Sequence, residues 1–184
     1  KLPDNTYNNI LGEISRNSWS ITTEGGIWEY DKLGGHPSKV IDDDLNSCIM
    51  WVKPGKTYSS KVDGVTQSVK GTDPMTMTVD MKQQETFNYF YLHHRSDGLA
   101  NPGFNVVEAI LYGSNDGTVF EEIETVPIEF TSGGDKIMLK KNCNYRYVKF
   151  KVSQWNQNPN YTVCIADFKL GFSEQDLMKK ANNL

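Results

Sequence analysis

The sequence lacks the patterns of several large protein classes. No run of about 18 apolar residues occurs, so no membrane-spanning helix is encoded. A Cys-x-x-Cys spacing, a His-Glu-x-x-His pattern and a glycine-rich phosphate loop are also missing. Serine and cysteine residues lack the setting of a nucleophile elbow. The sequence therefore gives no sign of a zinc site, a nucleotide-binding loop or a catalytic triad, and we expect a protein that is not an enzyme.

Cysteine and net charge are both scarce. The three cysteines, Cys48, Cys143 and Cys164, are an odd number without metal spacing. We interpret them as free buried thiols, with one disulfide and a spare thiol as the alternative. The formal net charge is −4. A slightly negative surface argues against nonspecific binding to nucleic acid or anionic lipid, so we expect no nucleic-acid partner.

Short β-strands are what the sequence does contain. Its 9 Tyr, 8 Phe and 4 Trp accompany many Val, Ile and Thr, the residues that favour strands. Hydrophobic alternation predicts strands at 19–22, 75–81, 87–93, 106–112, 120–126, 136–139, 145–152 and 162–172. Many short strands, turn-rich joints and no long helical pattern predict an all-β protein with an antiparallel β-sandwich.

The length of 184 residues fits one domain with short flanks. We expect a lead-in or linker at 1–14 and the β-sandwich at 15–172. The segment from Ser173 to Asp176 has capping-box spacing, which predicts a short C-terminal helix or tail at 173–184.

An acidic turn, Asp42-Asp43-Asp44, is followed by the hydroxyl of Ser47. Closely spaced carboxylates, carbonyls and a hydroxyl can surround a hard cation such as calcium with oxygens. Far downstream, Asp167 lies inside an apolar strand and would close such a cage. The expected ligands are Lys39 through its carbonyl, Asp42, Asp44, Ser47 and Asp167. The ion would be structural, since it would neutralise the turn and pin two distant segments together, whereas a solvated turn without an ion is the alternative.

The acidic turn and the late carboxylate also resemble the discoidin, or coagulation-factor type C, family. That family has an Asp-Gly-Asp turn, then Thr and Trp, and a Glu in its last strand. Here Asp43 stands at the Gly position and Asp167 at the Glu position. Two further segments, 90–95 and 109–120, resemble its central strand and its strand-turn-aromatic motif. The resemblance covers roughly 15–172 and implies a galactose-binding-like jelly roll, with the carbohydrate-binding modules of bacteria as the most similar branch.

The resemblance places a ligand site on the loops at one end of the sandwich, near the acidic turn. Arg95 and Asn101 have a spacing close to that in sugar-binding members of the family. The planar guanidinium of arginine offers a fork of donors that suits neighbouring hydroxyls. A loop-bracing salt bridge is an equal alternative for Arg95.

The loop at 153–161 adds two aromatic residues and five amides without net charge, which suits a neutral sugar. We predict Trp155 as the main stacking platform and Tyr161 as the second, although Trp155 at the edge of the core is an equal alternative. His36 and Trp28 lie on glycine-rich loops and are candidates for the same rim.

The sequence thus predicts a non-catalytic module that binds a neutral glycan, such as one of galactose type, within a larger extracellular or cell-surface protein. Any signal or anchor would lie outside this chain. A protein- or membrane-adhesion domain is the first alternative, with Leu99 and Phe104 as its only clear apolar loop tips. A spacer sandwich without a ligand is the second.

Overall fold

The computed structural model describes residues 12–32, 34–97, 101–131 and 133–174. Within these ranges the secondary structure consists of strands and two short 3-10 helices, η1 (Pro37–Ile41) and η2 (Pro102–Phe104). The strands are β1 (Ser20–Glu24), β2 (Ile49–Val52), β3 (Thr57–Val62), β4 (Val65–Lys70), β5 (Met75–His94), β6 (Val106–Ser114), β7 (Glu121–Pro127), β8 (Asp135–Trp155) and β9 (Thr162–Gly171). The predicted all-β class is confirmed. None of the described helices is long and apolar enough to cross a membrane.

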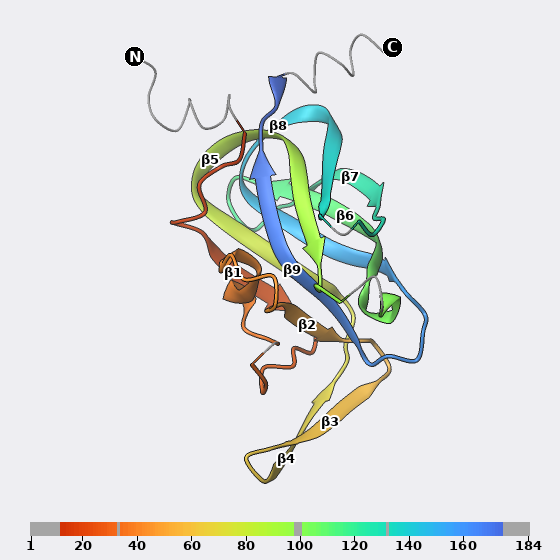
Figure 1. The fold of residues 1–184 in the computed structure, drawn as a ribbon. Helices are drawn as coiled ribbons and strands as arrows, with labels where there is room; N and C mark the ends of the chain where they lie inside the picture. The colour runs from red at the N-terminus through yellow and green to blue at the C-terminus, as the bar shows by residue number, and fades with distance from the viewer. Residues whose placement is uncertain (1–11, 33, 98–100, 132, 175–184) are drawn as a thin grey trace.

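Two long strands, β5 and β8, bend so that each belongs to both layers of a sandwich (Figure 1). The first part of β5 pairs with β1 and with the second part of β8. The last part of β5 pairs with β9 and with the first part of β8. The strand order is β2-β9-β5-β8-β6-β7, with β1 on β5, and all of these pairings are antiparallel.

The two layers meet in an aromatic core. Phe90 of β5 and Phe168 of β9 lie in one layer with ring centroids 6.0 Å apart, and Phe150 of β8 approaches Phe168 from the other layer at 5.8 Å. All three side chains are fully buried. Burying a large apolar side chain contributes about 1.5–3 kcal/mol, so these rings are a main source of the stability of the sandwich.

The sequence prediction split both long strands in two. Segments 75–81 and 87–93 are one strand, β5, with a register shift between Asp80 and Glu85 and a left-handed residue at Lys82 (φ 70°). Segments 136–139 and 145–152 are likewise parts of β8. Most of the polar residues between the apolar runs, those at 82–84 and 140–142, are exposed at bends, where a bulge turns the strand without ending it.

The hairpin β3–β4 was not predicted. Figure 1 shows that it extends from the body of the sandwich at the end near β2. Its turn residues Asp63 (φ 50°) and Gly64 (φ 79°) both have positive φ. Asp-Gly between Val62 and Val65 is the strongest short-range hairpin signal in a sequence, because a two-residue type I′ turn needs positive φ at both positions.

The segment before β1 joins the edge of the sandwich. Glu13 bridges to Gly171, the amide of Ile14 donates to the carbonyl of Leu170 at 2.8 Å, and Ile14 is buried. The expectations for residues 1–11 and 175–184 lie outside the described residues. Cys48, Cys143 and Cys164 are all buried and form no disulfide, as interpreted from the sequence.

The buried imidazole of His94, at the end of β5, should make the free energy of unfolding sensitive to acid. The ring is buried, with Phe130, Asp135 and His93 around it, and burial lowers its pKa from 6.5 to about 4. In this range the unfolded chain binds the proton and the folded chain does not. The contribution of neutral His94 to the free energy of unfolding is therefore complete above pH 6.5. This contribution, about 3 kcal/mol in total, is lost as the pH falls towards 4.

Urea unfolding between these pH values measures this loss. His94→Leu should flatten the pH dependence, whereas His36→Leu, which changes an exposed histidine, should keep the wild-type slope. An unchanged slope in His94→Leu would assign the acid sensitivity to other groups.

Candidate functional site

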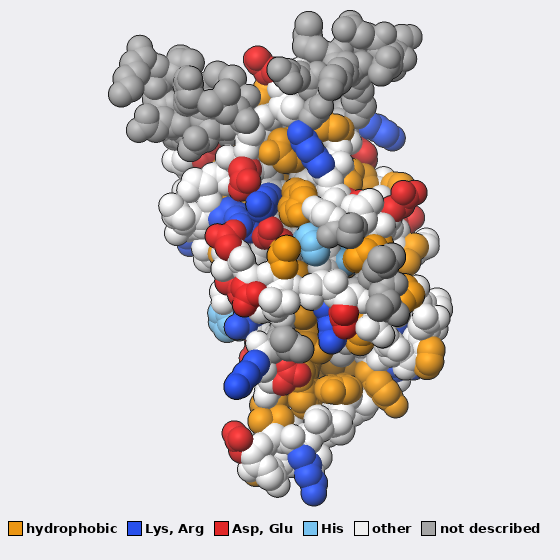
Figure 2. Space-filling view, in the orientation of Figure 1, with side chains coloured by type: hydrophobic (Ala, Val, Ile, Leu, Met, Phe, Trp, Pro, Cys, Tyr) orange, Lys and Arg blue, Asp and Glu red, His pale blue; other side chains and the backbone are white. Residues whose placement is uncertain are grey.

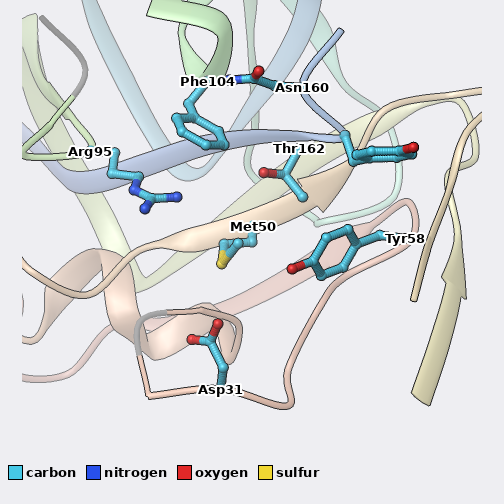
Figure 3. Close-up of a pocket in the computed structure, with 8 residues that line it drawn as sticks. Asp31, Met50, Tyr58, Arg95, Phe104, Asn160 and Thr162 are labelled. Carbon is cyan, nitrogen blue, oxygen red and sulfur yellow. The ribbon is translucent and has the colours of Figure 1, made fainter. Parts of the chain in front are cut away.

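One end of the sandwich carries a pocket of about 330 Å³ (Figure 3). Its size falls within the range of about 300–1,000 Å³ that is typical of small-molecule sites. The lining residues come from six separate parts of the chain: Asp31, Met50, Tyr58, Arg95, Phe104, Asn160, Tyr161 and Thr162. Loops and a sheet edge therefore converge here, as they do where β-sandwiches bind ligands.

The floor of the pocket is sheet. Met50 of β2 and Thr162 of β9 belong to paired strands, in which Met50 lies opposite Cys164 and Val52 lies opposite Thr162. Both residues are buried. Because two hydrogen-bonded strands hold the floor, its position is fixed by the same pairing that closes the sandwich.

Aromatic side chains form one wall. Tyr161 is half exposed, at 50%, and its ring lies 5.9 Å from that of Tyr58 at an angle of 52°. Tyr58 in turn meets the edge of Trp28, with centroids 4.6 Å apart and planes at 86°. Trp28 is buried, so it supports the wall from behind. Tyr58 belongs to the unpredicted hairpin, which therefore contributes directly to the site.

Arg95 lies on the opposite side of the pocket from Tyr58 in Figure 3. Its Nε is 2.8 Å from Oδ1 of Asp97, and its guanidinium lies 4.2 Å from the centroid of the Phe104 ring. A guanidinium on an aromatic face is held in one orientation while its edge stays available for hydrogen bonds. Asn101 donates to Oδ2 of Asp97 at 3.2 Å, so the predicted Arg95 and Asn101 pair meets through a shared carboxylate.

A buried lysine holds the loops around the pocket. Lys53 is 2% exposed, and its Nζ donates to the carbonyls of Gly103 (2.9 Å), Asn156 (2.9 Å) and Asn158 (3.1 Å). These carbonyls belong to η2 and to the loop before β9, the segments that carry Phe104, Asn160 and Tyr161. Burial lowers the pKa of the Lys53 ammonium. The three carbonyls surround this ammonium as they would surround a bound cation.

The acidic turn is folded around the hydroxyl of Ser47. Ser47 Oγ donates to the carboxylate of Asp42 and lies 3.0 Å from the carbonyl of Asp44. The amide of Asp44 donates back to Oδ1 of Asp42 at 3.0 Å. Asp43, at the position of the family glycine, has φ 59°, a left-handed conformation that aspartate tolerates.

An arginine links this turn to the last strand. Arg16 contacts Asp43 through one guanidinium nitrogen and Asp167 through another, both at 2.5 Å. It also donates to the carbonyls of Val40 (3.2 Å) and Phe168 (3.1 Å). The expected tie between the acidic turn and Asp167 is therefore present, but a guanidinium makes it.

The residues expected to bind calcium are thus divided between two groups. Asp42, Asp44 and Ser47 share contacts within the turn, whereas Asp167 faces Arg16 and Lys169. No cluster of three or more His, Cys, Asp or Glu side chains suited to a metal occurs in the described part of the chain. The turn supplies three convergent oxygens, fewer than the six to eight that calcium prefers, so it fits calcium in part only.

The comparison with protein families decides the identity of the fold. A model of the F5/8 type C domain matches residues 20–166, which is most of the chain. The chain belongs to the F5/8 type C (discoidin) family. The resemblance drawn from the sequence is confirmed, and so is the galactose-binding-like jelly roll that it implied. Comparison with curated proteins gives no match.

Solved structures resemble this F5/8 type C domain at low sequence identity. A family 32 carbohydrate-binding module of Clostridium perfringens NanJ, in complex with galactose, is 13% identical with a TM-score of 0.60, covering 86% of this chain and 98% of that one. Another C. perfringens module, in complex with GalNAc-β-1,3-galactose, is 16% identical with a TM-score of 0.60, covering 83% and 94%. An F5/8 type C domain from Bacteroides fragilis is 11% identical with a TM-score of 0.64, covering 86% and 93%. At these identities the likeness establishes the fold.

The F5/8 type C domain brings together two of the six predicted sugar-binding residues, Arg95 and Tyr161, in its pocket. Trp28 lies behind the wall instead of on the rim. His36 is exposed at the N-cap of η1, where its Nδ1 accepts from the amide of Ser38 at 3.1 Å, and it does not line the pocket. Asn101 is also outside the lining and reaches it only through Asp97.

Trp155 does not line the pocket and packs against the main core instead. Val148, Phe150 and Val152 alternate inward along β8, and simple alternation would turn residue 155 outward. Register shifts between β6 and β8, on both sides of Glu108, bring Trp155 opposite Val106. A bulge re-aims the side chains beyond it, which the sequence pattern did not reveal.

Six lining residues were not predicted for this site: Asp31, Met50, Tyr58, Phe104, Asn160 and Thr162. Phe104 was noted only as an apolar loop tip. Asn160 and Tyr161 are adjacent in the predicted loop, so the signal that indicated Tyr161 also covers this amide. Tyr58 depended on recognising the Asp63-Gly64 hairpin turn. Asp31 carries no local signal, since only the fold places it beside β2.

Proposed function

We propose that the pocket binds a neutral, galactose-type sugar without catalysing its reaction. The observation that carries this proposal is the pairing of an aromatic wall, Tyr58 and Tyr161, with a planar guanidinium, Arg95, across a pocket of about 330 Å³. One face of a pyranose ring is apolar and fits against an aromatic ring, while its rim carries hydroxyls. Family 32 modules of the same fold, in complex with galactose and GalNAc-β-1,3-galactose, support this choice of ligand.

Each polar group has a defined part in this proposal. Arg95 donates to two neighbouring hydroxyls, because its fork of donors has the matching geometry. The amide of Asn160 donates and accepts, and the carboxylate of Asp31 accepts. Tyr161 covers the apolar face of the ring. Lys53 makes no contact with the sugar; it positions the loops that do.

The pocket is suited to binding more than to hydrolysis. Among the described residues that line it, Asp31 is the only carboxylate. Glycoside hydrolysis generally uses two carboxylates on either side of the scissile bond. We therefore infer a non-catalytic module, which would act by holding a larger protein close to a glycan.

Isothermal titration with galactose tests the assignment. Tyr161→Ala is expected to lower the affinity at least about tenfold, because it removes the exposed half of the aromatic wall. Arg95→Lys should lower it by a similar factor, since lysine keeps the charge and loses the fork.

Val119→Ala is the matched control, because Val119 is an exposed apolar residue (67%) on the β6–β7 connection. Its affinity should equal that of the wild type. Galactose binding that survives both Tyr161→Ala and Arg95→Lys would place the sugar elsewhere on the domain, and the absence of binding to any glycan on an array would refute the proposed function.

A membrane- or protein-adhesion role is the second candidate, and it has less support. Of its two apolar loop tips, Phe104 is partly buried beneath Arg95, and Leu99 lies outside the described residues. We propose an extracellular or cell-surface location within a larger protein, as is general for glycan-capturing modules.

Calcium remains part of the proposal in a reduced form. We infer that Asp42, the Asp44 carbonyl and Ser47 would hold the ion, and that it would stabilise the turn alone, since Arg16 already ties the turn to β9. Calcium at ten times its dissociation constant should then raise the free energy of unfolding by about 1.4 kcal/mol. Thermal unfolding with calcium and with a chelator measures this difference. Asp42→Asn should remove it, and identical curves for the wild type under both conditions would exclude the ion.

A further inference from the structure

A second hollow adjoins the pocket. It has a volume of about 500 Å³ and lies between the loop around residues 28–32 and strand β3 of the hairpin. Tyr30, Asp31, Ser60 and Val62 are among its lining residues. Asp31 also lines the first pocket, so the two hollows adjoin at this residue.

The face of β3 runs through both hollows. Burial alternates along this strand, with Tyr58, Ser60 and Val62 half-buried and the residues between them exposed. Tyr58 lines the first pocket, and Ser60 and Val62 line the second. Because alternate side chains on a strand share one face, β3 provides a single surface that leads away from the proposed sugar site.

Aromatic rings follow the same path. Tyr161 contacts Tyr58, Tyr58 contacts Trp28, and Trp28 contacts Tyr30 with ring centroids 5.0 Å apart. Trp28 is buried, whereas Tyr161 and Tyr30 are 50% and 43% exposed. The aromatic cluster is thus accessible at both ends, one end in each hollow. Figure 2 shows hydrophobic side chains gathered on this face, above the hairpin.

The charges along the second hollow are mixed, with three carboxylates and two ammonium groups. Its lining includes Glu29, Asp31 and Asp63 together with Lys32 and Lys61. A mixed polar lining with one exposed tyrosine, supported from below by a tryptophan, suits a neutral ligand that carries hydroxyls. A strongly charged ligand would meet repulsion from one set or the other.

We propose that the second hollow is a sugar subsite, with Tyr30 as its platform, and that the ligand is an oligosaccharide of at least two units. The first unit occupies the pocket at Arg95 and Tyr161, and a following unit lies along β3 against Tyr30. This inference rests on the proposed function, since it extends the same ligand beyond the first pocket. The hairpin β3–β4 then acts as a specificity element for chain length.

Titration with ligands of increasing length tests the subsite. The probes are galactose, GalNAc-β-1,3-galactose, and galactose- or GalNAc-terminated oligosaccharides of three and four units. At least one oligosaccharide should bind about tenfold more tightly than galactose, which corresponds to about 1.4 kcal/mol for the second unit. Tyr30→Ala should remove this gain and leave the affinity for galactose within about twofold of the wild type.

Two further variants complete the test. Tyr30→Phe keeps the ring and should retain most of the gain. Val65→Ala, at an exposed residue (59%) on the same hairpin, should change neither affinity. Galactose binding with no gain for any oligosaccharide, or a gain that persists in Tyr30→Ala, would overturn the subsite and leave the first pocket intact. Absence of binding to every probe would overturn both.

Discussion

Replacing Lys53 with methionine is expected to destabilise the protein by about 3 kcal/mol and to weaken sugar binding at least about tenfold. Methionine keeps an unbranched apolar stem but removes the ammonium. Three carbonyls, those of Gly103, Asn156 and Asn158, then lose their buried donor. An unsatisfied buried polar group costs about 1–3 kcal/mol, and relief from burying a charge offsets part of the sum.

The binding loss has a separate cause. Lys53 holds η2 against the loop before β9, and a Cβ on Gly103 would already lie 2.4 Å from Nδ2 of Asn160. These segments are packed too closely to reposition independently. Releasing them moves Phe104, Asn160 and Tyr161 together, so the affinity falls although no contact with the sugar has been deleted.

Thermal unfolding and galactose titration measure both effects. A loss of about 3 kcal/mol corresponds to a lowering of Tm by about 6–12 °C for a domain of this size. Lys140→Met, which changes an exposed lysine, is the matched control and should alter neither quantity. Wild-type affinity in a folded Lys53→Met variant would show that the loops are positioned by other contacts.

Replacing Arg16 with methionine is expected to destabilise the protein by about 3–5 kcal/mol. The main cause is Asp167, which is 5% exposed and would keep only Lys169, 3.8 Å away, as a charged neighbour. Removing one partner of a buried ion pair leaves an uncompensated charge in a medium that solvates it poorly. Asp43 contributes little to this loss, because its side chain is 79% exposed and water replaces the guanidinium.

A double-mutant cycle isolates this interaction. Arg16→Met combined with Asp167→Asn should recover part of the stability that Arg16→Met alone loses, since the second change removes the stranded charge. Asp43→Asn should cost less than about 1 kcal/mol. Additive losses in the double variant would show that Arg16 and Asp167 act independently, and the tie between the acidic turn and β9 would then have to lie elsewhere.

The sequence predicted the architecture well, because strand signals are local. Alternation located parts of β1, β5, β6, β7, β8 and β9, and the family motifs fixed their arrangement. It could not show that β5 and β8 continue through their polar bends, since a bulge and a loop have similar composition. It predicted the region of the candidate site but not all of its aromatic residues. Trp155 was predicted to line it and is turned to the core by register shifts, whereas Tyr58 lines it and belongs to a hairpin that was not predicted.

The charged residues were the hardest to predict. Asp167 was expected to contact a cation together with Asp42, and it does contact a cation, but one supplied by Arg16, 151 residues away along the chain. The local sequence gives no indication that Lys53 is buried, because a lysine beside Pro54 and Gly55 is typical of an exposed turn. In both cases a positive side chain crosses the interior to carbonyls or carboxylates of distant segments, and only the assembled fold reveals the partners.

Strand β9 also determines how the domain can be carried by a longer polypeptide. It begins at Thr162 in the pocket floor and ends at Gly171 beside Glu13, so nine residue steps of about 3.3 Å separate the two ends by roughly 30 Å. The two ends of the described sandwich therefore lie side by side, at the pole opposite the pocket. A polypeptide attached there could be exchanged, lengthened or stiffened without crowding the glycan, and the reach of the module would be set by that tether alone.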